Sequence, residues 1–168
     1  MTMTLDDIPA GEPVLVDTNV FVYAFTKKSA RCLSLVQRCR AREVDGTVST
    51  HTLSEVCHRT MLAEAAELLK RQQISAKFLK GKPELFGSLR RYSSFVENLV
   101  RWSNLAIVQP SAEHFLRSQW IRDRYGLLTT DSINLCLMLE YNITAIATND
   151  SDFERIEGIQ VYKPGDIA

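Results

Sequence analysis

The sequence predicts an α/β fold, a three-layer α/β/α sandwich around a central parallel β-sheet. Short apolar runs alternate with longer segments whose apolar residues recur at spacings of three and four. Strands separated by helices in this way form parallel sheets with right-handed crossovers. In addition, the run at residues 14–16 is continuously apolar. A continuous run is typical of a strand that helices cover on both faces.

Each expected element has a local signal. The strand at residues 14–16 ends abruptly at Asp17, and a capped helix over residues 20–25 follows. Asp45–Gly46 is expected to form a turn, and residues 105–108 are expected to form another buried strand. The other expected strands are short runs at residues 47–49, 144–148 and 159–162. The other expected helices carry one apolar stripe each, at residues 29–42, 53–61, 85–99, 111–124 and 132–141.

Length and composition are those of an ordinary globular protein. At 168 residues, a single domain over residues 1–168 is expected. The longest apolar run, residues 20–25, is far too short to span a bilayer, and residues 1–11 lack the features of a signal peptide. We therefore expect a cytoplasmic protein with no membrane association. The four cysteines form no Cys-x-x-Cys pair, which predicts buried free thiols instead of a zinc site.

Charge is balanced overall but distributed unevenly. The chain has 20 basic and 20 acidic residues, so its net charge argues neither for nor against nucleic acid as a partner. A smaller basic cluster lies between Lys27 and Arg42. The densest cluster lies in the middle of the chain and consists of Lys70, Arg71, Lys77, Lys80, Lys82, Arg90 and Arg91. Each cluster is either a phosphate-facing surface or a solvated helix face.

Four carboxylates follow expected strands or begin expected helices. Asp17 and Asp150 lie at strand exits, whereas Glu55 and Asp131 lie in first turns of helices. All four can meet at the carboxyl edge of a parallel sheet, and Asp152 can reach the same place. Two carboxylates about 5 Å apart repel by roughly 3 kcal/mol at an effective dielectric near 20. No Lys or Arg neighbours any of the four in sequence, so Mg²⁺ or Mn²⁺ is the expected partner of this all-oxygen set.

Each carboxylate also has a purely structural interpretation. Asp17 and Asp150 can be turn or cap residues, Asp131 can cap its helix, and residues 52–55 match a capping box. His51 is expected in a surface or cap role. Taken together, however, the four acids favour a catalytic metal site over four separate structural roles. A partly hydrated acidic metal site suits phosphodiester hydrolysis, because the metal activates a bound water and stabilises charge on the phosphate.

Four segments spread over residues 14–162 carry a family resemblance. The sequence reads VLVDTN around Asp17, has Glu55 early in a helix, and reads TDSINL around Asp131 and ATNDSDF around Asp150. These segments resemble the motifs of PIN-domain ribonucleases, and are most similar to those of the VapC-like toxins of bacterial and archaeal toxin–antitoxin pairs. The resemblance implies a three-layer sandwich and a Mg²⁺- or Mn²⁺-dependent endoribonuclease that acts on RNA.

The resemblance also implies roles for individual residues and partners. Asn19 and Thr148 would be polar groups that hold the carboxylates, and Asp152 would be an additional member. The helical, basic middle segment at about residues 70–103 looks longer than in compact members of the family, and it is expected to face RNA or a partner. A homodimer and a small cognate antitoxin protein that occupies the site are implied as well. The metal-binding catalytic carboxylates would be Asp17, Glu55, Asp131 and Asp150.

Two other functions compete with the ribonuclease. A phosphotransferase or phosphatase on a similar sheet would use Asp17 as its nucleophile. Such enzymes place a second aspartate two residues later, where this chain has Asn19. A non-catalytic RNA-binding PIN module is the other alternative. The complete set of carboxylates argues against it, because binding RNA phosphates does not call for an acidic pocket.

Overall fold

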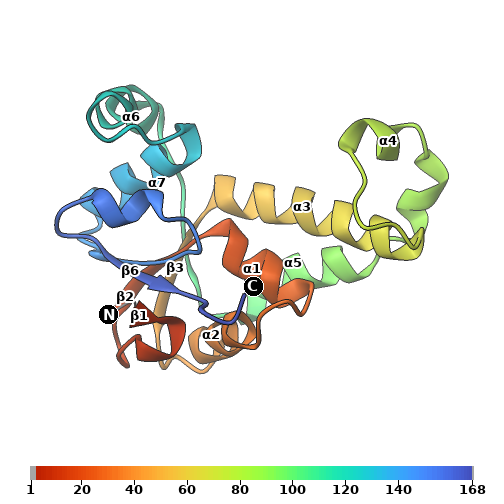
Figure 1. Cartoon of the computed structure of the whole chain (residues 1–168), viewed down its shortest axis with the longest axis horizontal. Coiled ribbons are helices and arrows are strands. Elements are labelled where there is room, and N and C mark those ends of the chain that lie inside the picture. The colour runs from red at the N-terminus through yellow and green to blue at the C-terminus, as the bar shows by residue number, and fades with distance from the viewer. Residues whose placement is uncertain (1–2, 168) are drawn as a thin grey trace.

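The computed structural model describes residues 3–167 and contains a six-stranded sheet in which all neighbouring strands are parallel (Figure 1). The strand order is β1-β6-β5-β2-β3-β4. Val16 pairs with Ala147 and Ser49 with Val108, so the carboxyl ends of the central strands lie at one edge. The strands are β1 (Met3–Thr4), β2 (Pro13–Val16), β3 (Asp45–Ser49), β4 (Ala106–Val108), β5 (Ala145–Ala147) and β6 (Gln160–Lys163).

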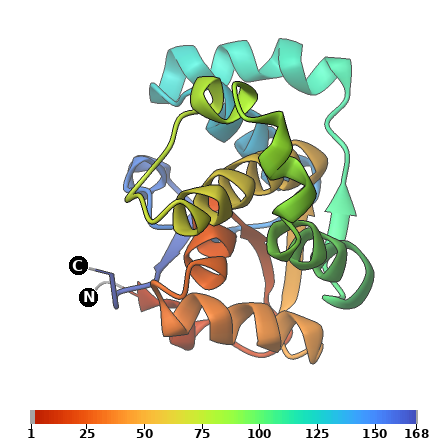
Figure 2. The ribbon, with the colours of Figure 1, turned by 90° about the vertical axis from the view of Figure 1, so that its right-hand side faces the viewer.

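Helices cover both faces of the sheet (Figure 2). Along β2, Val14 and Val16 pack into one core, whereas Leu15 packs into the core on the opposite face. The predicted three-layer α/β/α sandwich is therefore confirmed. The first layer contains α1 (Thr18–Phe25), α2 (Ala30–Arg40), α3 (Thr50–Leu68) and α5 (Arg91–Trp102), and the second contains α6 (Ala112–Tyr125) and α7 (Thr129–Glu140).

Two local predictions for the sheet are wrong. Asp45 and Gly46 belong to β3 and do not form a turn. A Cβ at position 46 would lie 2.6 Å from Cδ2 of Leu105 and 2.7 Å from Sγ of Cys39, so glycine here permits close packing of α2 and the chain that enters β4. The expected burial of residues 105–108 also fails, because β4 is an edge strand and leaves its side chains largely exposed.

Composition predicted buried thiols and no membrane span. Cys32, Cys39 and Cys136 are buried free thiols, as predicted, whereas Cys57 is only half-buried. Among residues 3–167, no helix is both long enough and apolar enough to cross a bilayer.

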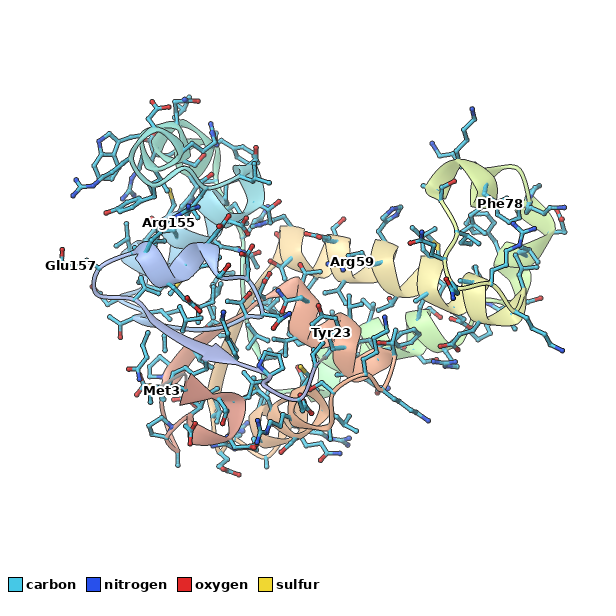
Figure 3. The ribbon with its side chains drawn as sticks, viewed as in Figure 1. Met3, Tyr23, Arg59, Phe78, Arg155 and Glu157 are labelled. Atoms are coloured by element: carbon cyan, nitrogen blue, oxygen red, sulfur yellow. The ribbon has the colours of Figure 1, made fainter. Side chains whose placement is uncertain are left out.

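Residues 61–92 form an arm that projects away from the sheet (Figure 1). The arm contains the end of α3, helix α4 (Ala76–Lys80), the 3₁₀ helix η2 (Pro83–Ser88) and the start of α5. Phe78 marks its outer part in Figure 3. Leu79 and Leu89 are buried in a small core that belongs to the arm alone. The expected helix over residues 85–99 is interrupted, because Leu89 adopts an extended conformation between η2 and α5.

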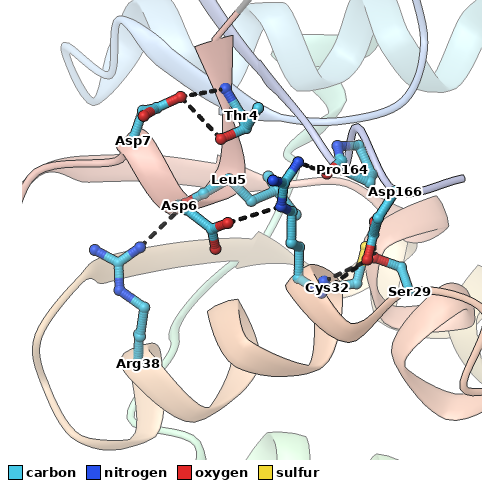
Figure 4. A network of polar contacts seen from close by, with 10 residues as sticks. Thr4, Leu5, Asp6, Asp7, Ser29, Cys32, Arg38, Pro164 and Asp166 are labelled. Carbon is cyan, nitrogen blue, oxygen red and sulfur yellow. Dashed lines mark hydrogen bonds and ion pairs between the residues drawn. The ribbon is translucent and has the colours of Figure 1, made fainter.

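Segments near both ends of the chain contact the start of α2 (Figure 4). Asp166 accepts a hydrogen bond of 2.6 Å from Oγ of Ser29. Nε of Arg31 lies 2.7 Å from Oδ2 of Asp6, which belongs to the 3₁₀ helix η1 (Leu5–Asp7). Nη1 of Arg31 also donates to the carbonyl oxygen of Pro164 across 3.1 Å. These contacts hold the β1–β6 edge of the sheet against α2.

Candidate active site

An acidic pocket of about 260 Å³ opens at the carboxyl edge of the sheet. The exits of β2 and β5, the first turns of α1 and α7 and the N-terminal half of α3 surround it. Four carboxylates line it, which are those of Asp17, Glu55, Asp131 and Asp150. Because these side chains come from positions up to 133 residues apart, only the parallel sheet brings them together.

Asp17 is both the cap of α1 and the most enclosed acid of the pocket. Its side chain is 7% exposed. Oδ1 accepts a hydrogen bond of 2.6 Å from the backbone N–H of Thr18. Oδ2 accepts two more, of 2.5 Å from Nδ2 of Asn19 and 2.7 Å from Oγ1 of Thr148. Burial raises the pKa of Asp17, and the nearby acids raise it further. The hydrogen bonds from Thr148 and Thr18 lower the pKa but do not offset the effect of burial.

Thr148 and Asn19 join the exits of β5 and β2. Oγ1 of Thr148 donates to Asp17 and accepts hydrogen bonds from Nδ2 of Asn19 at 2.9 Å and from the backbone N–H of Asp150 at 3.0 Å. Oδ1 of Asn19 accepts from the backbone N–H of Asn149 at 3.0 Å. The two side chains therefore fix the loop that carries Asp150 against the residue that caps α1.

Glu55 does not form the expected capping box. Ser49 caps α3, accepting a hydrogen bond of 3.1 Å from the backbone N–H of Thr52. The helix thus begins at Thr50, earlier than the capping-box sequence suggests, and Glu55 lies in its second turn. There Oε2 of Glu55 accepts a hydrogen bond of 3.3 Å from Oγ1 of Thr18, and the carboxylate faces the pocket.

Asp131 is the third residue of α7 and makes no side-chain cap bond, so the cap interpretation is wrong for this residue. Burial raises the pKa of Asp131 to about 7, and the nearby acids, foremost Asp17 and Asp150, contribute to the rise. A carboxyl with such a pKa gains and loses its proton near neutral pH. Once the proton has left, the carboxylate can bind a cation.

Asp150 and Asp152 follow β5 at different distances from the pocket. Asp150 lines the pocket and also accepts a hydrogen bond of 2.9 Å from the backbone N–H of Asp152, so it is a turn residue as well. Asp152 begins the 3₁₀ helix η3 (Asp152–Arg155) and pairs with Arg155 at 3.1 Å. It does not line the pocket, although its charge raises the pKa of Asp131.

Sequence analysis missed Arg59, which lines the pocket from α3 (Figure 3). Its Nη1 lies 3.7 Å from Oε1 of Glu55, one helical turn earlier. The signal was the spacing of four residues, which places both side chains on one face of a helix. His51 lies in the first turn of α3, next to the residue that caps this helix. It is half-buried beside Ser49, with Nδ1 at 2.9 Å from that hydroxyl oxygen, and burial lowers its pKa.

The middle basic cluster lies outside the pocket, and its members have different surroundings. Arg71 stacks on Phe78 at 4.6 Å, within the arm. Lys82 lies 3.9 Å from Glu84. Arg90 and Arg91, by contrast, lie at the base of the arm beside the end of α1. None of the seven basic residues lines the acidic pocket.

The chemistry of the pocket fits a divalent cation. Among residues 3–167, no three His, Cys, Asp or Glu side chains stand close enough to coordinate one ion directly. Mg²⁺ does not require such a cage, since one or two carboxylates and several waters usually complete its octahedron. Asp17, Glu55, Asp131 and Asp150 line the cavity and are the candidate donors of those oxygens, and the cavity has room for waters.

A sequence model of the PIN domain matches residues 14–159 of this chain. The chain belongs to the PIN-domain family. The matched segment runs from β2 to just before β6, and it therefore contains all four carboxylates of the acidic pocket as well as Asn19, Arg59 and Thr148.

Individual relatives of this PIN-domain chain share less than a third of their aligned residues with it. Ribonuclease VapC6 of Methanocaldococcus jannaschii is 29% identical over 92 residues, which are 51% of this chain and 60% of that protein. The chain thus matches less than two thirds of this curated relative. A toxin–antitoxin complex from Klebsiella pneumoniae has 20% identity and a TM-score of 0.54, covering 90% of this chain and 97% of that chain. The Mycobacterium tuberculosis toxin VapC20 has 14% identity and a TM-score of 0.58, covering 89% and 98%. At these identities, the likeness to solved structures shows the fold alone.

Proposed function

We propose that this protein is a metal-dependent endoribonuclease that hydrolyses phosphodiester bonds of RNA. The observation that carries the proposal is the convergence of four carboxylates on one small pocket. An anionic phosphate does not approach four carboxylates unless a cation lies between them. The pocket therefore favours metal-dependent chemistry over an RNA-binding module without catalysis, for which basic side chains suffice.

Asp17, Glu55, Asp131 and Asp150 would hold Mg²⁺ or Mn²⁺. When bound, the cation supplies Lewis-acid stabilisation of the charge that develops on the phosphate. The chain itself supplies orientation. Thr148 and Asn19 hold Oδ2 of Asp17, and the backbone N–H of Thr18 holds Oδ1, so this carboxylate is fixed before any ligand binds.

The residue two positions after Asp17 argues against the phosphotransferase. Such an enzyme would place a second carboxylate there, to act as acid or base. The position two residues later carries Asn19, whose amide donates to Asp17 and cannot serve as a general acid or base.

We further propose that the protein is the toxin of a toxin–antitoxin pair that acts on cytoplasmic RNA as a homodimer. A small cognate antitoxin protein would restrain it. The names of its relatives support this assignment, since one is a ribonuclease and another comes from a toxin–antitoxin complex. Leu128, which lines the acidic pocket and is 74% exposed, offers an apolar contact to a protein partner at the site.

Cleavage of an end-labelled RNA pool tests the proposal. We expect cleavage with Mg²⁺ or Mn²⁺, none with excess chelator, and none by Asp17→Asn or Asp150→Asn. Asp123→Asn is the matched control, because Asp123 lies exposed on α6 and contacts only Gln119 among the described residues. Cleavage that survives both chelation and Asp17→Asn contradicts the proposal. A covalent aspartyl phosphate detected by mass spectrometry would favour the phosphotransferase instead.

A further inference from the structure

A second hollow, of about 420 Å³, lies between the end of α1 and the start of α5. We call it the basic hollow and define it by Lys27, Arg90 and Arg91. No acidic side chain lines it. Phe25 and Phe95 form its apolar wall, with ring centroids 5.3 Å apart. Lys27 comes from the smaller basic cluster and the two arginines from the larger one, so the fold joins clusters that are distant in sequence.

Two of the three cations are available to a ligand. Among residues 3–167, neither Lys27 nor Arg90 forms an ion pair with an acidic side chain. Both side chains are exposed. Arg91 is partly engaged, because its guanidinium pairs with Glu67 and stacks on the ring of Phe25 at 4.8 Å. The hollow therefore carries an uncompensated positive charge.

Backbone hydrogen bonds fix the two chain segments that carry these cations. Lys27 adopts a left-handed conformation with φ of 57°, and its N–H donates to the carbonyl oxygen of Ala24 at 3.3 Å. A lysine with positive φ persists only where its surroundings impose that conformation. At the other side, Glu64 is 4% exposed and accepts backbone hydrogen bonds from Arg90 and Arg91, both of 3.0 Å. Because Glu64 binds the backbone, it leaves the Arg90 guanidinium free.

Helix α1 connects the basic hollow to the acidic pocket. Asp17 caps its first turn and Phe25 ends it. At 1.5 Å per residue, the eight residues of α1 span about 12 Å. A single RNA strand only a few nucleotides long covers that distance. Arg59, which lines the acidic pocket, comes from α3, and α3 packs against α1.

We propose that the basic hollow binds a backbone phosphate of single-stranded RNA, a few nucleotides from the bond that is cleaved in the acidic pocket. This inference rests on the proposed ribonuclease function. Lys27 and Arg90 contact the phosphate, and the strand follows α1 between the two sites. The arm then contributes to RNA binding through its base, at Arg90, and not through its outer part.

The test measures binding of fluorescein-labelled single-stranded RNA to cleavage-deficient Asp17→Asn protein at several salt concentrations. Each phosphate contact on a single strand contributes about 0.7 to the slope of log affinity against log salt. Lys27→Gln/Arg90→Gln removes one phosphate contact, so it should lower that slope by about 0.7 and weaken binding of a ten-nucleotide strand about tenfold at low salt. Binding of a dinucleotide, which is too short to reach the hollow, should not change.

The charge-matched control is Arg101→Gln/Arg124→Gln, which removes two exposed cations on α5 and α6 and should keep the slope. Should the double variant at the hollow lower the melting temperature strongly, Arg90→Gln alone replaces it, because this side chain makes no hydrogen bond among residues 3–167.

An unchanged slope for the hollow variant, or an equal loss in the control, overturns the inference. The proposed function survives that result if the native protein still cleaves RNA with metal. Absence of both metal-dependent cleavage and RNA binding in the native protein overturns the two together.

Discussion

Oγ1 of Thr148 donates a hydrogen bond of 2.7 Å to Oδ2 of Asp17, and this contact joins the exits of β5 and β2. Both side chains are buried, at 0% and 7% exposure. Asp17 is thereby oriented by a neighbouring strand as well as by Thr18 and Asn19 of its own segment. The orientation of the central carboxylate thus depends on correct strand pairing.

Thr148→Val should remove that hydrogen bond at nearly constant side-chain volume. We expect affinity for Mn²⁺ and the rate of RNA cleavage to fall about 10- to 100-fold, because groups that orient metal-binding carboxylates have effects of this size. Thr148→Ser, which retains the hydroxyl, should recover most of the loss. Thr60→Val is the control, since Thr60 is equally buried but donates only within α3. Titration with Mn²⁺ and single-turnover cleavage measure both effects, and equal losses in the two valine variants would contradict the prediction.

Removal of metal should make stability depend on pH through Asp131. Its pKa rises from 3.8 to about 7 on folding. The folded state therefore binds this proton more tightly than the unfolded state, and stability falls as pH rises from about 4 to 7. Added Mg²⁺ should raise the melting temperature more at pH 8 than at pH 5.5, because ligands bind metal when deprotonated. Asp131→Asn should flatten the dependence in thermal melts without metal. If the stability of Asp131→Asn depended on pH as steeply as that of the native protein, other groups would be responsible for the dependence.

Glu64→Gln should destabilise the arm. The two carboxylate oxygens of Glu64 accept backbone hydrogen bonds from Arg90, Arg91 and Tyr92, at 3.0, 3.0 and 2.7 Å. A glutamine keeps one oxygen and turns an N–H₂ group toward another donor. We expect a loss of about 1–3 kcal/mol in the free energy of unfolding, with earlier hydrogen exchange in α5. Glu67→Gln, at a half-exposed ion pair with Arg91, should cost at most about 1 kcal/mol.

Gly46→Ala should destabilise the sheet. The added Cβ would lie 2.6 Å from Cδ2 of Leu105 and 2.7 Å from Sγ of Cys39, so both of these side chains would have to shift within the core. Overpacking of this kind costs about 1–3 kcal/mol. Gly87→Ala is the matched control, because its Cβ would meet no atom within 4 Å. Urea denaturation compares the two variants, and similar midpoints would show that residues 39 and 105 move aside freely.

The predicted positions of the carboxylates were more accurate than their predicted local roles. Asp17 and Asp150 could be placed at one edge because both follow strands of a parallel sheet, and that edge is shared. The capping box at residues 52–55, the alternative role considered for Glu55, does not form, because the hydroxyl of Ser49 caps α3. Arg59 was missed because the sequence does not show which face of α3 lies toward the pocket. That depends on the elements that pack beside the helix.

By itself, the sequence determined the layers and the edge at which the acids gather, since both follow from local apolar patterns and from strand ends. Only the tertiary structure decided that Arg59 faces the acidic pocket and that Lys27 meets Arg90 beside α1. The physical reason is that both arrangements depend on how helices that are distant in sequence pack against one another. Such packing is set by the shapes of buried side chains such as those of Phe21, Val56 and Leu99, which join α1, α3 and α5, and no local pattern records it.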